Sequence, residues 1–272
     1  MRKILSQLRY IFLAIASLIS IFPFLWMIVS MTNKSIDVTK GSVIPGAYFF
    51  ENLKSLFTSD LGFGNALWNS AKISVLTTII SLIVCSLAGY GFEIFRNKFR
   101  DRIFNMLLLS MMVPFAALMI PLFKMFSSFK VFGLNTAAAV IIPTISTAFL
   151  IFFFRQNTKA FPKEILEAGR IDGLSELGIF TKIYFPTMKS TYAAAAIITF
   201  MTSWNNYMWP LIALQSPEKR TVPLIIATMN SSYTPDLGMI MAGIVIATLP
   251  TAIIFFVMQK HFVAGMLGSV KG

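Results

Sequence analysis

The sequence predicts an all-α, polytopic membrane protein with six transmembrane helices. Hydrophobic residues make up 56% of the 272 residues and charged residues only 12%, whereas soluble domains carry about 25% charged residues. Six apolar stretches each have about 20 residues, the length that a helix needs to cross a bilayer. Asp, Glu, Lys, Arg and His are absent from all six, which are residues 11–31, 73–92, 104–123, 134–154, 192–214 and 237–258.

The first stretch follows the basic segment MRKILSQLRY, which resembles the start of a signal peptide. Signal peptides have apolar cores of roughly 7–15 residues and a small-residue cleavage site. Here the apolar stretch is longer and continues into the bulky sequence FPFLWMIVSM. We therefore predict an uncleaved first span.

Prolines interrupt the apolar stretches at six positions. They are tolerated in membrane helices because neighbouring helices satisfy the freed backbone groups. We expect each to kink a span, and these residues are Pro23, Pro114, Pro121, Pro143, Pro210 and Pro250.

The formal net charge of +12 could indicate a nucleic-acid-binding protein. The basic residues, however, flank the apolar stretches and form no basic stripe interleaved with aromatic residues. We therefore predict no nucleic-acid partner. The single cysteine, Cys85, excludes a disulfide framework and a cysteine zinc site, and His261 is the only histidine.

The distribution of Lys and Arg predicts the orientation, because cytoplasmic connections carry the excess of basic residues. With the N-terminus inside, 15 basic residues lie on the cytoplasmic side and 8 outside. Both termini are then cytoplasmic, and residues 155–191 form a large cytoplasmic loop. The outer loops are 32–72, with a short amphipathic helix at YFFENLKSLF near the outer surface, and the long, polar 215–236. We predict a single transmembrane domain, residues 1–272.

The cytoplasmic loop contains a polar, amphipathic stretch, EILEAGRIDGLSELGIFTKIYFP. Pro162 suits the first turn of a helix, where its missing N–H is not needed. Asp172 and Gly173 form a turn signal, and Ser175 can cap a second helix. We expect Pro186 to end that helix, so the stretch predicts a hairpin of two short helices.

Each helix of this hairpin has a face of apolar or small residues, although no bilayer surrounds it. Either these faces dock into a cleft on a soluble partner, or they pack against the cytoplasmic ends of the chain's own spans. The residues expected there are Ile165, Ala168 and Gly169 on the first helix and Leu177, Phe180, Ile183 and Tyr184 on the second.

The hairpin sequence EAGRIDGLSELGIFTKIYFP resembles the EAA motif of ABC-importer permeases, through Glu167, Ala168, Asp172, Gly173, Ile183 and Pro186. The likeness covers nearly the whole chain. FRQNTKAFPKEILEAGRIDG, NSAKISVLTTIISLIVCSLAGYGFEIFR, SWNNYMWPLIAL and LPTAIIFFVMQKHFVAGMLGSVKG are similar to segments of carbohydrate permeases of the maltose and multiple-sugar transporter type. The chain departs from the motif at Gly169, which replaces its second alanine, and at Ser190, where a second proline is common.

The resemblance implies the ABC-importer permease fold in a prokaryotic inner membrane. It further implies that the chain forms half of a translocation pathway for sugars. The implied partners are a second permease, two cytoplasmic ATP-binding subunits, an extracellular or periplasmic sugar-binding protein and the membrane lipid. The residues that would dock the ATPase are Glu167, Ala168, Gly169, Asp172 and Gly173, and the tail 261–272 would also reach the ATPase pair.

No catalytic site, metal site or cofactor site is expected on this chain. The phosphate-binding pattern G-x-x-x-x-G-K-[ST] is absent from the sequence, so ATP and Mg belong on the partner ATPase and the chain is not an enzyme. The alternatives are an ABC importer for a non-sugar solute and an ion-coupled secondary transporter. The second is disfavoured because such proteins usually place ionisable residues inside the membrane.

A sugar pathway needs hydrogen-bonding side chains and aromatic walls, and the fifth stretch supplies both. Thr199, Thr202, Asn206 and Trp209 lie at helical spacing on one stripe. They either line the pathway or join helices through hydrogen bonds. The pathway residues that we predict are Thr202, Trp204, Asn205, Asn206, Tyr207 and Trp209. The loop 215–236 either faces the binding protein or is a solvated connection.

Overall fold

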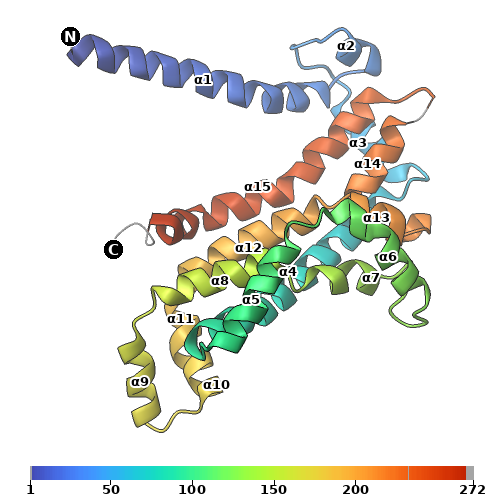
Figure 1. Ribbon diagram of the computed structural model, residues 1–272. Coiled ribbons are helices and arrows are strands. Elements are labelled where there is room, and N and C mark those ends of the chain that lie inside the picture. The colour runs from blue at the N-terminus through green and yellow to red at the C-terminus, as the bar shows by residue number, and fades with distance from the viewer. Residues whose placement is uncertain (1, 232, 268–272) are drawn as a thin grey trace. The chain divides into compact units, whose positions relative to one another are not determined.

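The computed structural model describes the backbone of residues 2–231 and 233–267, and the side chains of residues 6–231 and 233–259. The described residues form helices and no strand, which confirms the all-α prediction (Figure 1). The tail predicted to reach the ATPase, residues 261–272, lies outside the residues with described side chains.

Eighteen helical segments follow one another along the described chain. They are α1 (Arg2–Ser30), α2 (Ser35–Thr39), α3 (Phe49–Thr58), α4 (Phe63–Ile94), α5 (Lys98–Ser110), α6 (Phe115–Ser127), α7 (Ala137–Ile141), η1 (Ile142–Thr144), α8 (Ala148–Lys159), α9 (Lys163–Ile171), α10 (Glu176–Ile179), η2 (Phe180–Tyr184), α11 (Phe185–Thr187), α12 (Lys189–Trp204), α13 (Met208–Ala213), η3 (Pro217–Lys219), α14 (Val222–Asn230) and α15 (Leu237–Leu267).

Three described helices are long and apolar enough to cross a membrane: residues 6–30 of α1, α4, and residues 237–259 of α15. Two further pairs would span only as bent units, α5 with α6 at 101° and α7–η1 with α8 at 43°. The fifth predicted stretch, 192–214, is divided between α12 and α13, of 16 and 6 residues. The structure therefore supports three to five spans by this test, and the count of six stays a prediction.

Proline explains two of the three breaks in the predicted spans. Pro114 caps the start of α6 and Pro210 lies in the first turn of α13. The missing proline N–H needs no partner at these positions, so a new helical segment begins there. Pro143 lies inside the continuous helix Ala137–Thr144, and the break follows it at residues 145–147. The expected position within a helix is also found for Pro23, Pro121 and Pro250.

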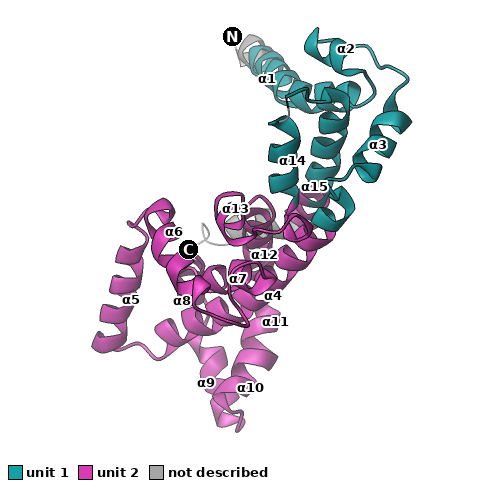
Figure 2. Ribbon diagram, turned by 90° about the vertical axis from the view of Figure 1, so that its right-hand side faces the viewer, with its two compact units in different colours: residues 1–67, 222–250 teal, residues 68–221, 251–272 magenta. Residues whose placement is uncertain are grey.

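The chain divides into two compact units, residues 1–67 with 222–250 and residues 68–221 with 251–272 (Figure 2). The first unit has a core of Leu56, Phe63, Ile225 and Met229 among others. The Asn52 side chain donates to the carbonyls of Met31 and Asn33, both at 2.9 Å, and so ties α3 to the end of α1.

The helix predicted at YFFENLKSLF is present as α3. The expectation of a long, polar loop at 215–236 is wrong in part. Residues 222–230 form the apolar helix α14, whose Val222, Leu224, Ile225 and Met229 are buried. The prediction relied on the charged residues near the start of this loop. It therefore missed the apolar segment that follows them, which packs in the core of the first unit.

In the second unit, α4 and α8 pack closely because α4 has a glycine at the contact. A Cβ at Gly89 would lie 2.6 Å from Phe154 Cβ and 2.8 Å from the backbone nitrogen of Arg155. Such distances are shorter than any normal van der Waals contact, so a larger residue would push the helices apart.

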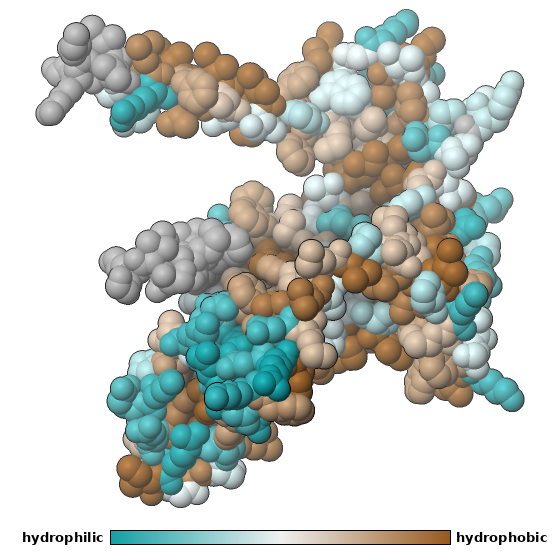
Figure 3. All heavy atoms as spheres, viewed as in Figure 1, coloured by the Kyte–Doolittle hydropathy of each residue, from teal (hydrophilic) through white to brown (hydrophobic). Residues whose placement is uncertain are grey.

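Beside that contact, buried charges join three helices. Arg155 of α8 donates to Glu93 of α4 at 3.2 Å and to Asp101 of α5 at 2.5 Å. Arg155 and Glu93 are buried, and the guanidinium also lies 4.0 Å from the ring centroid of Phe104. Asp101 binds Arg96 as well, and hydrogen bonds from Arg96 and Arg155 hold the pKa of Asp101 below its usual value. In Figure 3 hydrophilic residues gather over the start of α5 and over α9, whereas the surface of α1 is mostly hydrophobic.

Candidate functional site

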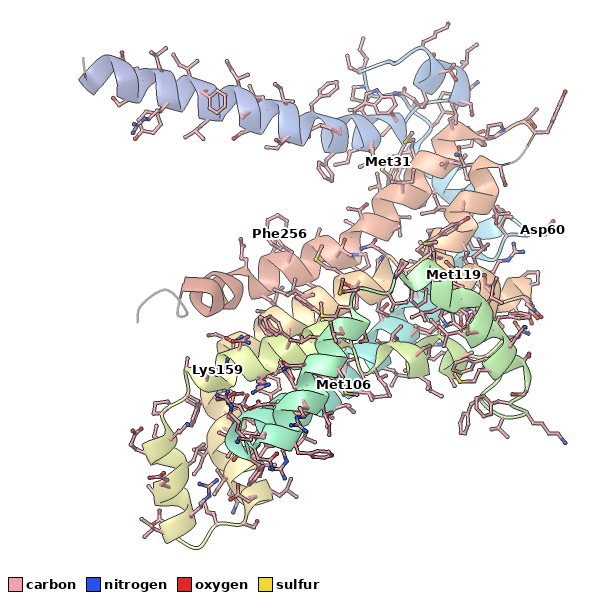
Figure 4. All side chains as sticks on the ribbon, viewed as in Figure 1. Met31, Asp60, Met106, Met119, Lys159 and Phe256 are labelled. Carbon is pink, nitrogen blue, oxygen red and sulfur yellow. The ribbon has the colours of Figure 1, made fainter. Side chains whose placement is uncertain are left out.

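The predicted hairpin is present in the second unit and begins just after Lys159, which is labelled at the end of α8 in Figure 4. Pro162 is the N-cap of α9. Gly173 has φ +82, a conformation that favours glycine, and turns the chain after α9. Ser175 Oγ then accepts from the N–H of Gly178 at 3.2 Å and caps α10. The turn and the cap are as predicted.

The second helix of the hairpin does not end at Pro186, contrary to the prediction. A π-helical turn, η2, precedes the proline, and the N–H of Phe185 bonds to the carbonyl of Phe180. Helical hydrogen bonding then resumes with Met188 N–H to the Tyr184 carbonyl at 3.0 Å. Because the wider turn shifts the hydrogen-bond register just before the proline, the chain passes through α11 almost directly into α12.

The inner face of the hairpin packs on the chain's own helices. Leu166, Ile179 and Tyr184 are buried in a cluster with Tyr90 of α4 and Phe161. The inner face thus packs against the chain's own helices, one of the two arrangements considered for the hairpin. Phe180 and Tyr184 are buried there, as expected.

Tyr184 anchors the hairpin to the end of α8. Its hydroxyl shares a hydrogen bond of 2.6 Å with Thr158 Oγ1. Burial raises the pKa of Tyr184, so the phenol keeps its proton. The hairpin is therefore joined to α8 by a polar bond as well as by apolar packing.

A salt bridge that the sequence did not reveal joins the two helices of the hairpin. Arg170 of α9 donates to Glu176 of α10 at 2.7 Å, and the hydroxyl of Tyr90 donates to the same carboxylate at 3.4 Å. The hydrogen bond from Arg170 lowers the pKa of Glu176. The sequence contains both charges but cannot show that the turn at Gly173 brings them together.

The outer face of the hairpin is exposed in the described chain. Apolar side chains lie there: Ile165 is 43% exposed, Leu177 66% and Ile171 87%. Leu177 was expected with Phe180 and Tyr184, but it lies on the opposite side. The outer face also includes four of the five predicted docking residues, which are Glu167, Ala168, Asp172 and Gly173.

Gly169, the fifth predicted docking residue, is buried on the inner face instead. A Cβ there would lie 2.8 Å from Ile183 Cδ1 and 3.3 Å from Ile179 Cγ1. Its small size thus lets the two helices of the hairpin approach each other, whereas we had expected it to admit a partner.

A cavity of about 210 Å³ lies in the second unit among α4, η1, α8 and α12. Among the predicted pathway residues, Thr202 and Asn206 line it, together with Thr199. It is lined by Thr77, Ser81, Thr144, Thr147, Phe149, Leu150, Ile198, Thr199, Thr202, Ser203 and Asn206.

The other predicted pathway residues are not among those that line this cavity. Trp209 is fully buried, and its Nε1 donates to the carbonyl of Ala139 at 2.8 Å. Trp204 is buried with its ring stacked on Phe200 at 5.7 Å between centroids.

Asn205 and Tyr207 are exposed at the end of α12 and beyond it. Helical spacing wrongly grouped Trp209 with the threonines, because the helix stops at Trp204 and restarts at Met208.

Two of the three broken spans of the second unit border the cavity. Thr144 and Thr147 lie at the break between η1 and α8, and Ser203 and Asn206 lie at the end of α12. Irregular backbone at membrane depth is tolerated only where protein buries it or where it lines a cavity. These two breaks therefore bring hydroxyl and carboxamide side chains to a cavity whose lining surface is otherwise mostly apolar.

The prediction overlooked the hydroxyls that α4 and η1 contribute to the cavity. Thr77 and Ser81 of α4 line the cavity, and with Ser70 and Ser74, which do not line it, they form a buried row at helical spacing. That period was a usable signal for a polar face within an apolar span. Among the residues with described side chains, no group of three or more His, Cys, Asp or Glu is arranged to hold a metal.

Residues 86–268 match the family model described as "Binding-protein-dependent transport system inner membrane component". The chain is 48% identical over 270 residues to the lactose transport system permease protein LacG of Rhizobium radiobacter, covering 99% of this chain and 98% of that protein. It is 36% identical to the arabinooligosaccharides transport system permease protein AraQ of Halalkalibacterium halodurans, covering 99% and 98%.

The fold is similar to a chain of a solved bacterial ABC transporter involved in the import of the acidic polysaccharide alginate. The TM-score is 0.85 at 22% identity, and the match covers 96% of this chain and 97% of that one. The structural likeness therefore extends over almost the entire fold.

Proposed function

The chain belongs to the family of binding-protein-dependent transport system inner membrane components, and from that premise we propose that it is one permease half of an ATP-driven importer of saccharides. Two relatives that match over 98% of their own length are named for lactose and arabinooligosaccharide transport. The same assignment makes the chain a transport subunit rather than an enzyme.

Family membership implies a second permease, an ATPase and a solute-binding protein. We propose that the second permease is a different chain and that two ATP-binding subunits hold the ATP and Mg. Both termini and the hairpin lie on the cytoplasmic side in this proposal, because the basic residues concentrate there. The segment 215–236 then faces the binding protein.

The observation that carries the proposal is the exposed outer face of the α9–α10 hairpin. Ile171 and Leu177 are largely exposed, as is Glu167, on a hairpin that is too polar to enter a bilayer. Apolar side chains clustered on a water-facing surface indicate a protein partner. A cleft on the ATPase would cover them, and Glu167 would supply a polar contact at its edge.

The inner face explains how such docking acts on the transport pathway. Tyr184 and Phe161 pack with Tyr90 of α4, and Tyr184 bonds Thr158 of α8. The second helix of the hairpin continues into α12 through the π turn. Movement of the hairpin by the ATPase would therefore reach α4, α8 and α12, the helices that surround the cavity.

The test is the charge reversal Glu167→Lys, with Glu164→Lys as its matched control. Both glutamates are exposed on α9, but Glu164 lies in the first turn and outside the predicted docking set. In proteoliposomes that contain the complete importer, we expect Glu167→Lys to abolish the coupling of ATP hydrolysis to uptake. The Glu164→Lys importer should retain most of its uptake.

Accumulation of saccharide at the normal rate by the Glu167→Lys importer would refute the coupling role. If both variants lost uptake to the same extent, the cause would be disruption of the α9 helix rather than loss of a specific contact of Glu167. A solute panel completes the test, because ATP-driven uptake of a non-sugar solute alone would reject the saccharide assignment.

A further inference from the structure

We infer that the cavity among α4, η1, α8 and α12 binds one ring of a neutral saccharide directly, with Thr77 as a hydrogen-bonding residue. This inference rests on the proposed function and deepens it. It assigns substrate contact to this permease half, and it restricts the substrate to sugars without a charged group at the bound ring.

The chemistry of the lining matches a polyhydroxylated, uncharged ligand. Seven of the eleven lining residues carry a hydroxyl, one carries a carboxamide, and none is charged. Each hydroxyl can both donate and accept, and a carboxamide offers two donors and an acceptor. Most of the surface that lines the cavity is nevertheless apolar, so it would pack against the ring of a sugar, and only a few of these polar groups would meet the sugar hydroxyls.

Thr77 provides an independent sign that a ligand is expected. It is only 2% exposed, it lines the cavity, and its Oγ1 has no hydrogen-bond partner among the described residues. Other threonine hydroxyls on α4 and α12 have hydrogen-bond partners. Thr78 donates to the carbonyl of Ser74 at 2.7 Å, and Thr202 donates to that of Ile198 at 2.8 Å. A buried unsatisfied hydroxyl is destabilising. The Thr77 oxygen is closed off from the cavity in this structure, so a rotation of the side chain toward the cavity would let a ligand hydroxyl pair with it.

Asn206 offers a second group to the ligand from another segment that lines the cavity. It follows the end of α12 and is half-buried, and its side chain makes no hydrogen bond with the other described residues. Thr77 on α4 and Asn206 beyond α12 thus present polar groups from two helices far apart in the sequence.

The same lining disfavours an anionic sugar. A phosphate or carboxylate that leaves water without a paired cation loses its solvation without compensation, and no lysine or arginine lines the cavity. The start of α8 supplies only about half a positive charge. Part of that is already used, because Thr147 Oγ1 accepts from the N–H of Leu150 at 3.3 Å.

The cavity volume sets the size of the bound unit. At about 210 Å³ it is smaller than the roughly 300–1,000 Å³ of sites for drug-sized ligands. One ring therefore fits, and the rest of a longer saccharide would extend beyond the residues of this cavity.

The experiment uses the complete importer in proteoliposomes with its binding protein, and lactose as the neutral probe. Thr77→Val removes the hydroxyl at nearly constant volume, and Thr78→Val is the matched control on the same helix. Loss of one neutral hydrogen bond corresponds to about a two- to tenfold rise in the half-saturating lactose concentration. We expect that rise for Thr77→Val and none for Thr78→Val.

Because Thr77 has no protein partner, the valine variant should fold as well as the parent, and the thermal midpoint of both variants checks this. Asn206→Leu should likewise raise the half-saturating concentration. Sn-glycerol 3-phosphate serves as the anionic probe and should be neither transported nor inhibitory at concentrations that saturate lactose uptake.

Unchanged lactose kinetics in Thr77→Val, or equal changes in both threonine variants, would overturn the inference while leaving the proposed function in place. Uptake of glycerol phosphate as efficient as that of lactose would overturn the restriction to neutral sugars. If the parent importer moves neither lactose nor any other saccharide, the proposed function fails together with the inference.

Discussion

Replacing Arg155 with methionine tests whether buried charges hold the second unit together. The guanidinium joins α8 to Glu93 of α4 at 3.2 Å and to Asp101 of α5 at 2.5 Å. The Arg155 side chain is 5% exposed and that of Glu93 is 7% exposed. Without Arg155, the Glu93 carboxylate stays buried without a cation, whereas Asp101 keeps its bond to Arg96 at 3.0 Å.

The expected loss therefore comes from Glu93. Removing one partner of a buried ion pair costs about 3–5 kcal/mol, and each kcal/mol lowers the melting temperature of a chain of this size by about 2–4 °C. We expect Arg155→Met to lower the thermal midpoint by about 6–20 °C. The double variant Arg155→Met/Glu93→Met removes both charges and should recover most of that loss.

Cys85 provides the assay, because it is fully buried beside Phe154 and Leu150 in the core of the second unit. A fluorogenic maleimide reacts with it only when that core opens, provided that the other subunits carry no cysteine. Arg96→Met, which alters a pair with a 58% exposed arginine, serves as the control and should leave the thermal midpoint nearly unchanged. The reasoning is refuted if Arg155→Met melts within 2 °C of the parent, a margin of roughly 1 kcal/mol, or if the double variant is no more stable than the single one.

Three further substitutions test packing in the second unit. A Cβ at Gly89 would lie 2.6 Å from a side-chain carbon of α8, whereas one at Gly91 meets nothing within 4 Å. We expect Gly89→Ala to cost about 1–3 kcal/mol and Gly91→Ala to be neutral or stabilising, and equal thiol-reactivity melting curves would contradict this. Trp209→Phe should cost about 1–3 kcal/mol through the lost bond to a buried carbonyl, with lactose half-saturation unchanged. A changed half-saturation at normal stability would instead place Trp209 in the pathway.

Local chemistry explains which parts of the candidate site were predicted. Gly173 and Ser175 mark the turn and the cap of the hairpin from a few neighbouring residues, and both are confirmed. The end of the second helix was wrong because Pro186 removes only one N–H, and a π turn absorbs that loss. Gly169 was expected on the outer face but lies on the inner one. Glycine has no side chain whose hydrophobicity could indicate which face of a helix is buried.

The cavity was only partly predictable, because local sequence patterns do not show where helices end or which side chains lack partners. Thr202 and Asn206 stood out as polar residues in an apolar stretch, and they do line it. Trp209 was grouped with them by counting along a helix that in fact stops at Trp204. Thr77 was overlooked because a single hydroxyl is common in apolar helices, and its unpaired state becomes visible only when its neighbours are known.

By itself the sequence determined the helical class, the long apolar segments and the hairpin turn, since hydrophobicity and turn preference act between residues close along the chain. Only the tertiary structure decided that Glu93 meets Arg155, that Arg170 meets Glu176, and that hydroxyls from separate helices share one cavity. Those pairings depend on how helices distant in sequence cross and where they break, and no local pattern encodes that geometry.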